Sequence, residues 1–347
     1  MVVNTGWEIA DARFIDFHRI EIDWKTEMEG ANEPRNFIVE LDGARLPVCL
    51  NEDEEAWDTR CVYEPAKRRT TLCLQHPIRL EDLGKIKLTV NGTVHPVQGG
   101  PPAELRAFRV KHFEPFYARF TRTSSGILIK SSARVDLAVH EMASEMIDIM
   151  LSQRSEIAQK LAEYGASLAI YGLQEDAYDI PEHRGGVDFL KYTVEGFGGM
   201  PSIPVTSVSE KNIRRYWEGP YQTKYKNESI LAHEFGHAIH LIGVNNLEDQ
   251  SLARQFNDAY EHAVANKLWP DTYAISNYEE YFATLTAIWF NVMAESKDGT
   301  WDGVRGPVNT REELKAYDPV GYAFFESIYP ACSFPEPWSS TPDDFSF

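Results

Sequence analysis

Hydrophobic and polar residues alternate in short runs along the first part of the chain. The clearest run extends from Arg13 to Trp24, and residues 36–42 and 70–75 repeat the pattern. A fourth run, Lys85 to Val97, is interrupted by Asn91-Gly92, a dipeptide favoured in two-residue hairpin turns. Alternation with a period of two predicts strands that bury one face, so we expect an all-β region here.

The spacing of these strands resembles that of immunoglobulin-like sandwiches, which predicts an immunoglobulin-like accessory domain over residues 1–100. A charged loop, residues 51–69, interrupts the strands. Gly99-Gly-Pro-Pro102 then forms a stiff joint, and a chain of 347 residues is long enough for two domains. We therefore expect the second domain to cover residues 104–347.

Beyond the joint, strand-like and helix-like patterns mix, which predicts an α+β fold. Strands are expected at residues 107–113, 126–130 and 167–171, and one amphipathic helical segment at residues 133–164. Residues 198–208 are extended and contain Pro201 and Pro204, which cannot donate to a strand ladder. This segment is either a loop or an edge strand, and an edge strand could bind an extended peptide.

The run from Leu231 to His240 contains the pattern His-Glu-x-x-His. On a helix, His233 and His237 share a face and can bind one zinc ion, while Glu234 reaches the water on that ion. Asn227 is the expected N-cap and Gly243 the expected end of this helix. The apolar residues of the run lie on the opposite face, so the histidines should face a cleft.

A catalytic zinc usually takes a third protein ligand. The metzincin pattern requires a glycine at position 240 and a histidine at position 243, whereas the chain has His240 and Gly243. We therefore expect His240 to lie behind the ligands or at the surface. Ser276 or Asn277 can cap a later helix, which would hold Glu279 or Glu280 in its first turn, either as a ligand or only as part of the cap.

This second segment resembles that of the zinc peptidases related to anthrax lethal factor and the clostridial Pro-Pro endopeptidases. The matching residues are Asn277, Glu280, Phe282 and Ala283, with Tyr273 seven residues before the glutamate. The resemblance implies a zincin-like metallopeptidase domain of the gluzincin type. It also implies that Glu280, rather than Glu279, is the third zinc ligand and that Tyr273 faces the substrate carbonyl.

These motifs predict a zinc-dependent endopeptidase with one catalytic Zn²⁺, in which Glu234 is the general base and Tyr273 assists. The substrate would be a peptide or protein bound as an extended strand. One alternative is an amidase or other zinc hydrolase that acts on a small molecule or a modified peptide. Another is a binding or anchoring protein with a structural zinc site, although such a site does not need the carboxylate of Glu234.

Composition narrows the range of partners and locations. The chain has 34 Lys and Arg against 53 Asp and Glu, a net charge of −19, which argues against nucleic acid and anionic membranes as partners. No apolar run is long enough to predict a membrane span. The start lacks a leader pattern, which predicts a cytoplasmic protein, or a secreted one if a leader was removed. The four cysteines lack metal-finger spacing and are expected to be buried thiols or to form one disulfide.

Overall fold

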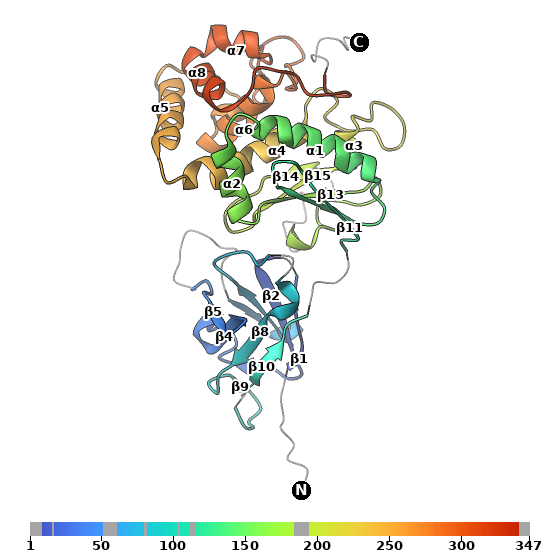
Figure 1. Ribbon diagram of the computed structural model, residues 1–347, viewed down its shortest axis with the longest axis vertical. Helices are drawn as coiled ribbons and strands as arrows, with labels where there is room; N and C mark the ends of the chain where they lie inside the picture. Colours follow the sequence, from blue (N-terminus) through green and yellow to red (C-terminus); the bar gives the residue numbers. More distant parts are fainter. Residues whose placement is uncertain are drawn as a thin grey trace. The chain divides into compact units, whose positions relative to one another are not determined.

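The computed structural model describes residues 9–15, 17–50, 61–79, 82–102, 105–111, 116–183 and 194–339. The chain divides into two compact units, Met1–Pro115 and Phe116–Phe347 (Figure 1). The predicted boundary at residues 99–102 lies earlier than this division. The difference arises because the chain continues in the first unit after Pro102, where strand β10 (Leu105–Arg109) pairs with strand β8 (Lys87–Val90).

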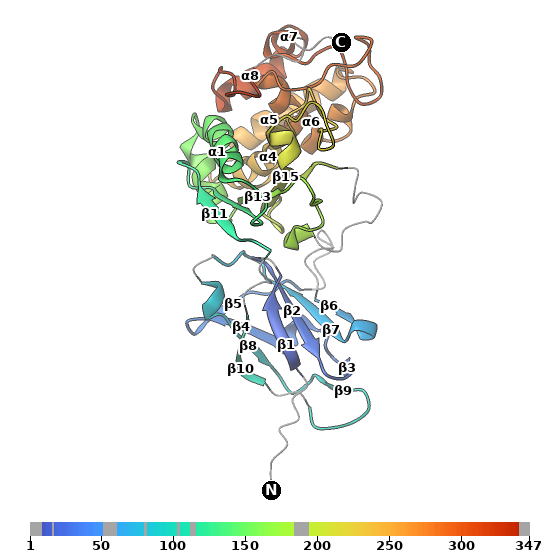
Figure 2. The same ribbon diagram turned by 90° about the vertical axis from the view of Figure 1, so that its right-hand side faces the viewer.

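The first unit contains two four-stranded antiparallel sheets (Figure 2). One sheet has the order β1 (Ile9–Phe14), β2 (Arg19–Trp24), β7 (Arg69–Cys73) and β6 (Val62–Glu64). The other has the order β10, β8, β4 (Phe37–Leu41) and β5 (Ala44–Leu46). A separate pair joins β3 (Met28–Glu29) to β9 (His95–Pro96), and short 3-10 turns occur at Pro34–Asn36, Pro65–Lys67 and Leu83–Lys85.

The predicted alternation accounts for the core of this unit. Ile20, Ile22 and Trp24 of β2 are buried, and the ring centroid of Trp24 lies 6.5 Å from that of Phe37 in the other sheet. The indole nitrogen of Trp24 donates to the Thr70 hydroxyl at 2.8 Å, so its polar atom has a partner inside the core.

Strand pairing in this unit differs from two local predictions. The run from Arg13 to Trp24 is not one strand, because the Ile15 amide donates to the Arg19 carbonyl and the chain reverses between β1 and β2. Asn91-Gly92 does not close a hairpin either. Strand β8 already has β4 and β10 as neighbours, so β9 pairs with β3 instead. Of the predicted charged loop, residues 51–60 lie outside the described part of the chain.

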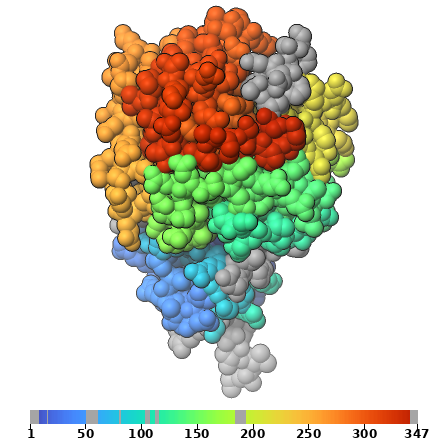
Figure 3. All heavy atoms as spheres, turned by 45° about the horizontal axis from the view of Figure 1, so that its top comes forward, coloured from blue at the N-terminus to red at the C-terminus, as the bar shows by residue number. Residues whose placement is uncertain are grey.

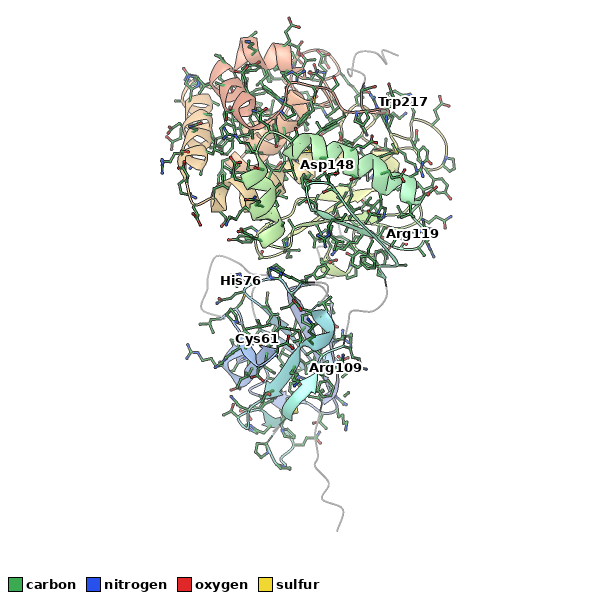
Figure 4. The ribbon with its side chains drawn as sticks, viewed as in Figure 1. Cys61, His76, Arg109, Arg119, Asp148 and Trp217 are labelled. Carbon is green, nitrogen blue, oxygen red and sulfur yellow. The ribbon has the colours of Figure 1, made fainter. Side chains whose placement is uncertain are left out.

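None of the four cysteines, all of which lie in the described part of the chain, forms a disulfide, so the disulfide alternative is wrong. Cys49, Cys61 and Cys73 are buried in the first unit, and Cys332 is exposed in the second. Figure 4 labels Cys61, whose pKa burial raises to about 12. A thiol with so high a pKa is not ionised at neutral pH and is a poor nucleophile.

The second unit is built on a five-stranded mixed sheet in the order β11-β12-β13-β15-β14. Strands β12, β13 and β15 are parallel, and the two outer strands are antiparallel to their neighbours. The strands are β11 (Arg119–Arg122), β12 (Leu128–Ser131), β13 (Ser167–Tyr171), β14 (Gly196–Phe197) and β15 (Val205–Ser209).

The helices of this unit pack against the sheet and against one another, and they share one hydrophobic core with it (Figure 1). They are α1 (Leu137–Leu151), α2 (Ser155–Glu163), α3 (Glu210–Ile213), α4 (Ile230–Ala238), α5 (Ser251–Ala265), α6 (Tyr278–Trp289), α7 (Arg311–Tyr317) and α8 (Pro319–Ile328). Short 3-10 turns occur at Pro181–His183, Val244–Asn246 and Tyr273–Ile275, and a π turn at Ile239–Gly243. No helix in the described ranges is long and apolar enough to cross a membrane.

The predicted helix over residues 133–164 is two helices, α1 and α2. The break between them lies against the end of α8, where the side chains of Gln153 and Arg154 donate to the carbonyls of Glu326 and Ser327 at 2.9 and 2.8 Å. Figure 3 shows the red surface of this C-terminal region beside the green surface of α1 and α2. A tertiary contact therefore marks a break that the hydrophobic period alone does not reveal.

The predicted edge strand over residues 198–208 is wrong in position. Strand β15 lies between β13 and β14, and all five of its residues are buried, which is typical of a central strand. The edge is β14, whose two residues come just before the predicted segment. Pro201 and Pro204 lie in the short connection between the two strands, where no ladder bond is required of them.

Candidate metal centre

Helix α4 carries the His-Glu-x-x-His pattern. Its N-cap is Ser229, whose hydroxyl accepts from the Ala232 amide at 3.3 Å. The predicted cap, Asn227, instead accepts from the Arg215 guanidinium at 3.3 Å, so its side chain is not free to cap the helix. Gly243 does not end the helical segment either, because α4 continues through the π turn into a 3-10 turn.

Helix α6 begins as the second motif predicts. Asn277 is its N-cap, and the Asn277 side chain accepts from the Glu280 amide at 2.8 Å. This cap fixes the Glu280 backbone in the first turn, with its carboxylate directed at α4. Gly236 allows α4 to approach closely, since a Cβ at this position would lie 3.3 Å from Ala283 Cα and 3.2 Å from the Thr286 hydroxyl.

The structure brings His233, His237 and Glu280 together. The Oε2 atom of Glu280 lies 3.2 Å from His233 Nε2 and 3.5 Å from His237 Nε2. One ligand atom from each of the three side chains lies within 4.8 Å of the other two. Both imidazoles are buried, with 7% and 8% of their residue surfaces exposed.

Tyr273 completes the arrangement from the 3-10 turn before α6. Its hydroxyl donates to Glu280 Oε1 at 3.0 Å, and its ring stacks on His233 at a centroid distance of 6.4 Å. The residue is half exposed, so this side of the cluster is accessible to solvent. A carboxylate held by two imidazoles and a phenol is thus fixed on several sides.

A run of glycines beside the cluster was missed by the sequence analysis. At position 196 in β14, a Cβ would lie 2.7 Å from Glu234 Cγ, and at position 198 a Cβ would lie 2.6 Å from His237 Cβ. Only glycine lets the backbone pass this close to α4. The alternate glycines of Gly196-Phe-Gly-Gly199 are the signal in the sequence that could have located this contact.

The charges of the cluster depend on one another. Burial alone would lower the pKa of His233, but the hydrogen bond to Glu280 and the charge of Glu234 raise it to about 9. Burial opposes ionisation of Glu280, yet the hydrogen bonds from His233 and His237 lower the pKa of this carboxyl well below its ordinary value. Glu280 is therefore ionised at neutral pH, as a metal ligand must be.

Burial raises the pKa of both Glu234 and Tyr273. It raises the pKa of Glu234 against the opposing charges of the two histidines. Burial and the neighbouring Glu280 carboxylate raise the pKa of Tyr273 far above that of a free phenol, so its hydroxyl keeps its proton at neutral pH.

His240 is not at the surface, and it is not part of the ligand cluster. It is fully buried, with its ring stacked on Phe282 at a centroid distance of 4.7 Å and edge-on to Phe256 at 4.5 Å. Burial lowers the pKa of His240 to about 3, so the ring is neutral. It belongs to the aromatic core behind α4.

The donor set fits a divalent transition metal. Two imidazole nitrogens and one ionised carboxylate oxygen are a common ligand set of catalytic zinc, which leaves the fourth position for water. The second unit is thus an α+β fold with a candidate metal centre of two histidines and a glutamate.

Comparison with known proteins gives distant structural neighbours only. The Pro-Pro endopeptidase PPEP-2 from Paenibacillus alvei is 17% identical with a TM-score of 0.32, over 57% of this chain and 94% of that one. The S-layer protein SbsC is 18% identical with a TM-score of 0.25, over 38% of this chain. This match spans only 17% of the SbsC chain. No protein family profile and no curated protein matches the chain.

Proposed function

We propose that this protein is a zinc-dependent endopeptidase. The observation that carries the proposal is the convergence of His233, His237 and Glu280, with one ligand atom of each within 4.8 Å of the others. Glu234 lies on the same helix between the two histidines, where a structural metal site would need no carboxylate. The resemblance of both motifs to those of the lethal factor and Pro-Pro endopeptidase group supports the same chemistry.

Bound zinc would act as a Lewis acid that lowers the pKa of water toward about 7. His233, His237 and Glu280 would hold the ion. The Glu234 carboxylate takes the proton of the attacking water and passes it to the nitrogen of the leaving amine. Its raised pKa brings it closer to the neutral range, which suits a group that must both accept and donate a proton.

Tyr273 is suited to stabilise the developing oxyanion of the substrate. Its hydroxyl keeps its proton at neutral pH because its pKa is raised, and half of the residue is open to solvent. A donor of this kind typically contributes about 100- to 1000-fold in rate. Its present acceptor is Glu280 Oε1, at 3.0 Å, so the hydroxyl lies beside the proposed ligands.

The substrate would be an extended peptide that adds to the sheet at β14. This strand is last in the sheet order. Its Gly196 lies against Glu234, and Gly198, just after the strand, lies against His237. Strand addition supplies main-chain hydrogen bonds to the peptide and takes place at the outer strand of a sheet. The net charge of −19 makes nucleic acid an unfavourable ligand. For the first unit we propose an accessory role with an immunoglobulin-like sandwich topology.

The test is cleavage of peptide libraries by zinc-loaded protein, with Glu234→Gln as the matched control. We expect defined scissile bonds for the native chain and a loss of about 100- to 10,000-fold in rate for Glu234→Gln, because the base is absent. Zinc content, measured by mass spectrometry, should be unchanged in the variant. Retained activity in purified Glu234→Gln contradicts the proposal.

Two further outcomes separate the alternatives. Hydrolysis of small amides without cleavage of any library peptide identifies an amidase. Stoichiometric zinc without hydrolysis of either substrate class identifies a structural site in a binding protein.

A further inference from the structure

Tyr273 is held in place by a segment that follows it well along the chain. Its backbone amide donates to the carbonyl of Val304 at 3.0 Å. Val304 belongs to a tight turn, residues 301–306, between α6 and α7, which we name the rim turn. The position of the Tyr273 backbone therefore depends on how firmly the rim turn is fixed.

The rim turn is well ordered by its own contacts. The Asp302 carboxylate accepts from the amides of Val304 and Arg305 at 2.9 and 2.7 Å, and the Asp302 amide donates to the Arg305 carbonyl at 3.0 Å. The ring of Trp301 covers Gly306 so closely that a Cβ there would lie 2.2 Å from it. These contacts fix the shape of the rim turn. A separate contact is needed to fix the position of the turn relative to α4.

Arg305 provides this contact. Its Nη2 donates to Glu228 Oε2 at 2.5 Å, and the two side chains are 27% and 9% exposed. Glu228 immediately precedes Ser229, the N-cap of α4. Burial opposes the charge of Arg305, but the neighbouring Glu228 raises the pKa of Arg305, so the guanidinium keeps its charge. Such a charge-assisted bond in a partly buried site is stronger than an exposed ion pair.

We propose that Arg305 is a positioning residue that holds Tyr273 in register with the histidines of α4. The contacts form a closed circuit. They run from α4 through Glu228 and Arg305 to the carbonyl of Val304, then to Tyr273 and Glu280, and from Glu280 back to the α4 histidines. The catalytic consequence rests on the proposed endopeptidase function, but the positioning of Tyr273 does not.

The first test measures position without activity. In Arg305→Met, amide hydrogen exchange of residues 272–275 should accelerate about tenfold or more, because the acceptor carbonyl of Val304 loses its anchor. Exchange in α6 should not change. The matched control is Arg214→Met, which removes an Arg–Glu pair of similar burial, with side chains 23% and 6% exposed, from α3. Unchanged exchange at Tyr273 in Arg305→Met overturns the proposal.

The second test is a double-mutant cycle on peptide cleavage. Arg305→Met should lower kcat about 10- to 100-fold with little change in KM and with full zinc content, because a displaced donor weakens only the transition state. In the Tyr273→Phe background, the same substitution should cost almost nothing further. An equal loss in both backgrounds shows a general structural role and contradicts the proposal.

Two conservative variants keep the test decisive if Arg305→Met does not fold. Glu228→Gln removes the buried charge but keeps an acceptor, and Arg305→Lys keeps the charge without the planar fork. Both should show the same changes to a smaller degree. If the native protein cleaves no peptide, the proposed function fails, and the hydrogen exchange result still decides whether Arg305 positions Tyr273.

Discussion

At the residue scale, two buried histidines of the second unit have opposite surroundings. The ring nitrogens of His140 lie 2.8 and 2.7 Å from the hydroxyls of Thr121 and Ser131. Both ring nitrogens of His240 are buried without a hydrogen-bond partner in the described part of the chain. A buried polar atom without a partner is costly, so His240 contributes less to stability than its aromatic packing alone would.

We therefore expect opposite effects from the same substitution. His240→Phe should raise the free energy of unfolding by about 1–3 kcal/mol at neutral pH, because it keeps the stacked ring and removes two unpartnered nitrogens. His140→Phe should lower it by a similar amount, about 1–3 kcal/mol, because the hydroxyls of half-buried Thr121 and buried Ser131 each lose a hydrogen bond to the ring. Urea unfolding followed by fluorescence measures both. Destabilisation by both variants would show that the His240 nitrogens have partners after all.

The pH dependence of the same residue has a definite sign. The pKa of His240 is lowered to about 3 in the folded protein, whereas an unfolded histidine has a pKa of about 6.5. Below pH 6.5 the unfolded chain takes up a proton that the folded one does not, so stability falls with falling pH. His240→Phe lacks this loss. The free energy of unfolding of His240→Phe should therefore exceed that of the native chain by about 1.4 kcal/mol more for each unit that the pH falls between roughly 6 and 4.

Glu280 and Glu279 allow a direct comparison within one helical turn. Glu280→Ala should abolish stoichiometric zinc binding, because two imidazoles remain as ligands. Glu279→Ala removes a carboxylate one residue earlier in the same turn and should keep the metal. Zinc content after dialysis against a weak chelator measures the difference. Full occupancy in Glu280→Ala would require a different third ligand.

The sequence was informative for this site where spacing along a helix determines proximity. His233, Glu234 and His237 share one helix, so the local pattern suffices for these three residues. The capping pattern alone left Glu279 and Glu280 both open, and only the resemblance to the zinc peptidases selected Glu280, which the Asn277 cap holds in the first turn of α6. Arg305 has no such pattern. It meets Glu228 only because the rim turn folds back on the start of α4, and no local period records that contact.

At the scale of elements, β14 and the residues that follow it are matched to α4 through glycines. Gly198→Ala should push the backbone away from His237, since its Cβ would lie 2.6 Å from His237 Cβ. Strain of about 1–3 kcal/mol in the metal-bound state corresponds to a loss of about 5- to 150-fold in zinc affinity. The neighbouring Gly199→Ala is the control, because a Cβ there has more room: its nearest contact is the Thr206 hydroxyl at 3.1 Å. Competition with a coloured chelator gives both affinities, and equal values would contradict this role.

Strand existence was predicted better than strand partnership. The alternation around β2, β4 and β7 is local, and each strand forms within two residues of its predicted range or inside it. Whether β9 pairs with β8 or with β3 depends on which edges are already occupied. Which of β14 and β15 lies at the edge also depends on the neighbouring strands. All five residues of β15 are buried because strands flank it on both sides, and the sequence of β15 alone does not reveal those neighbours.

At the scale of the whole molecule, the metal ligands and their supports all lie in the second unit. Zinc should therefore stabilise that unit and leave the first one unchanged. With free zinc about 100-fold above its dissociation constant, the gain is about 2.7 kcal/mol. Hydrogen exchange with and without a chelator, compared between β2 and α4, measures it. If zinc slowed hydrogen exchange equally in β2 and in α4, the two units would unfold together, contrary to this prediction.

The close contact between α4 and α6 limits which sequences the metal motif can tolerate. Metal chemistry places no demand on the two positions between Glu234 and His237. Packing does, because Phe235 is fully buried and Gly236 has Ala283 and Thr286 within 3.3 Å of where a Cβ would stand. If both positions were randomised and zinc-binding chains selected, position 235 would return large apolar residues and position 236 almost only glycine.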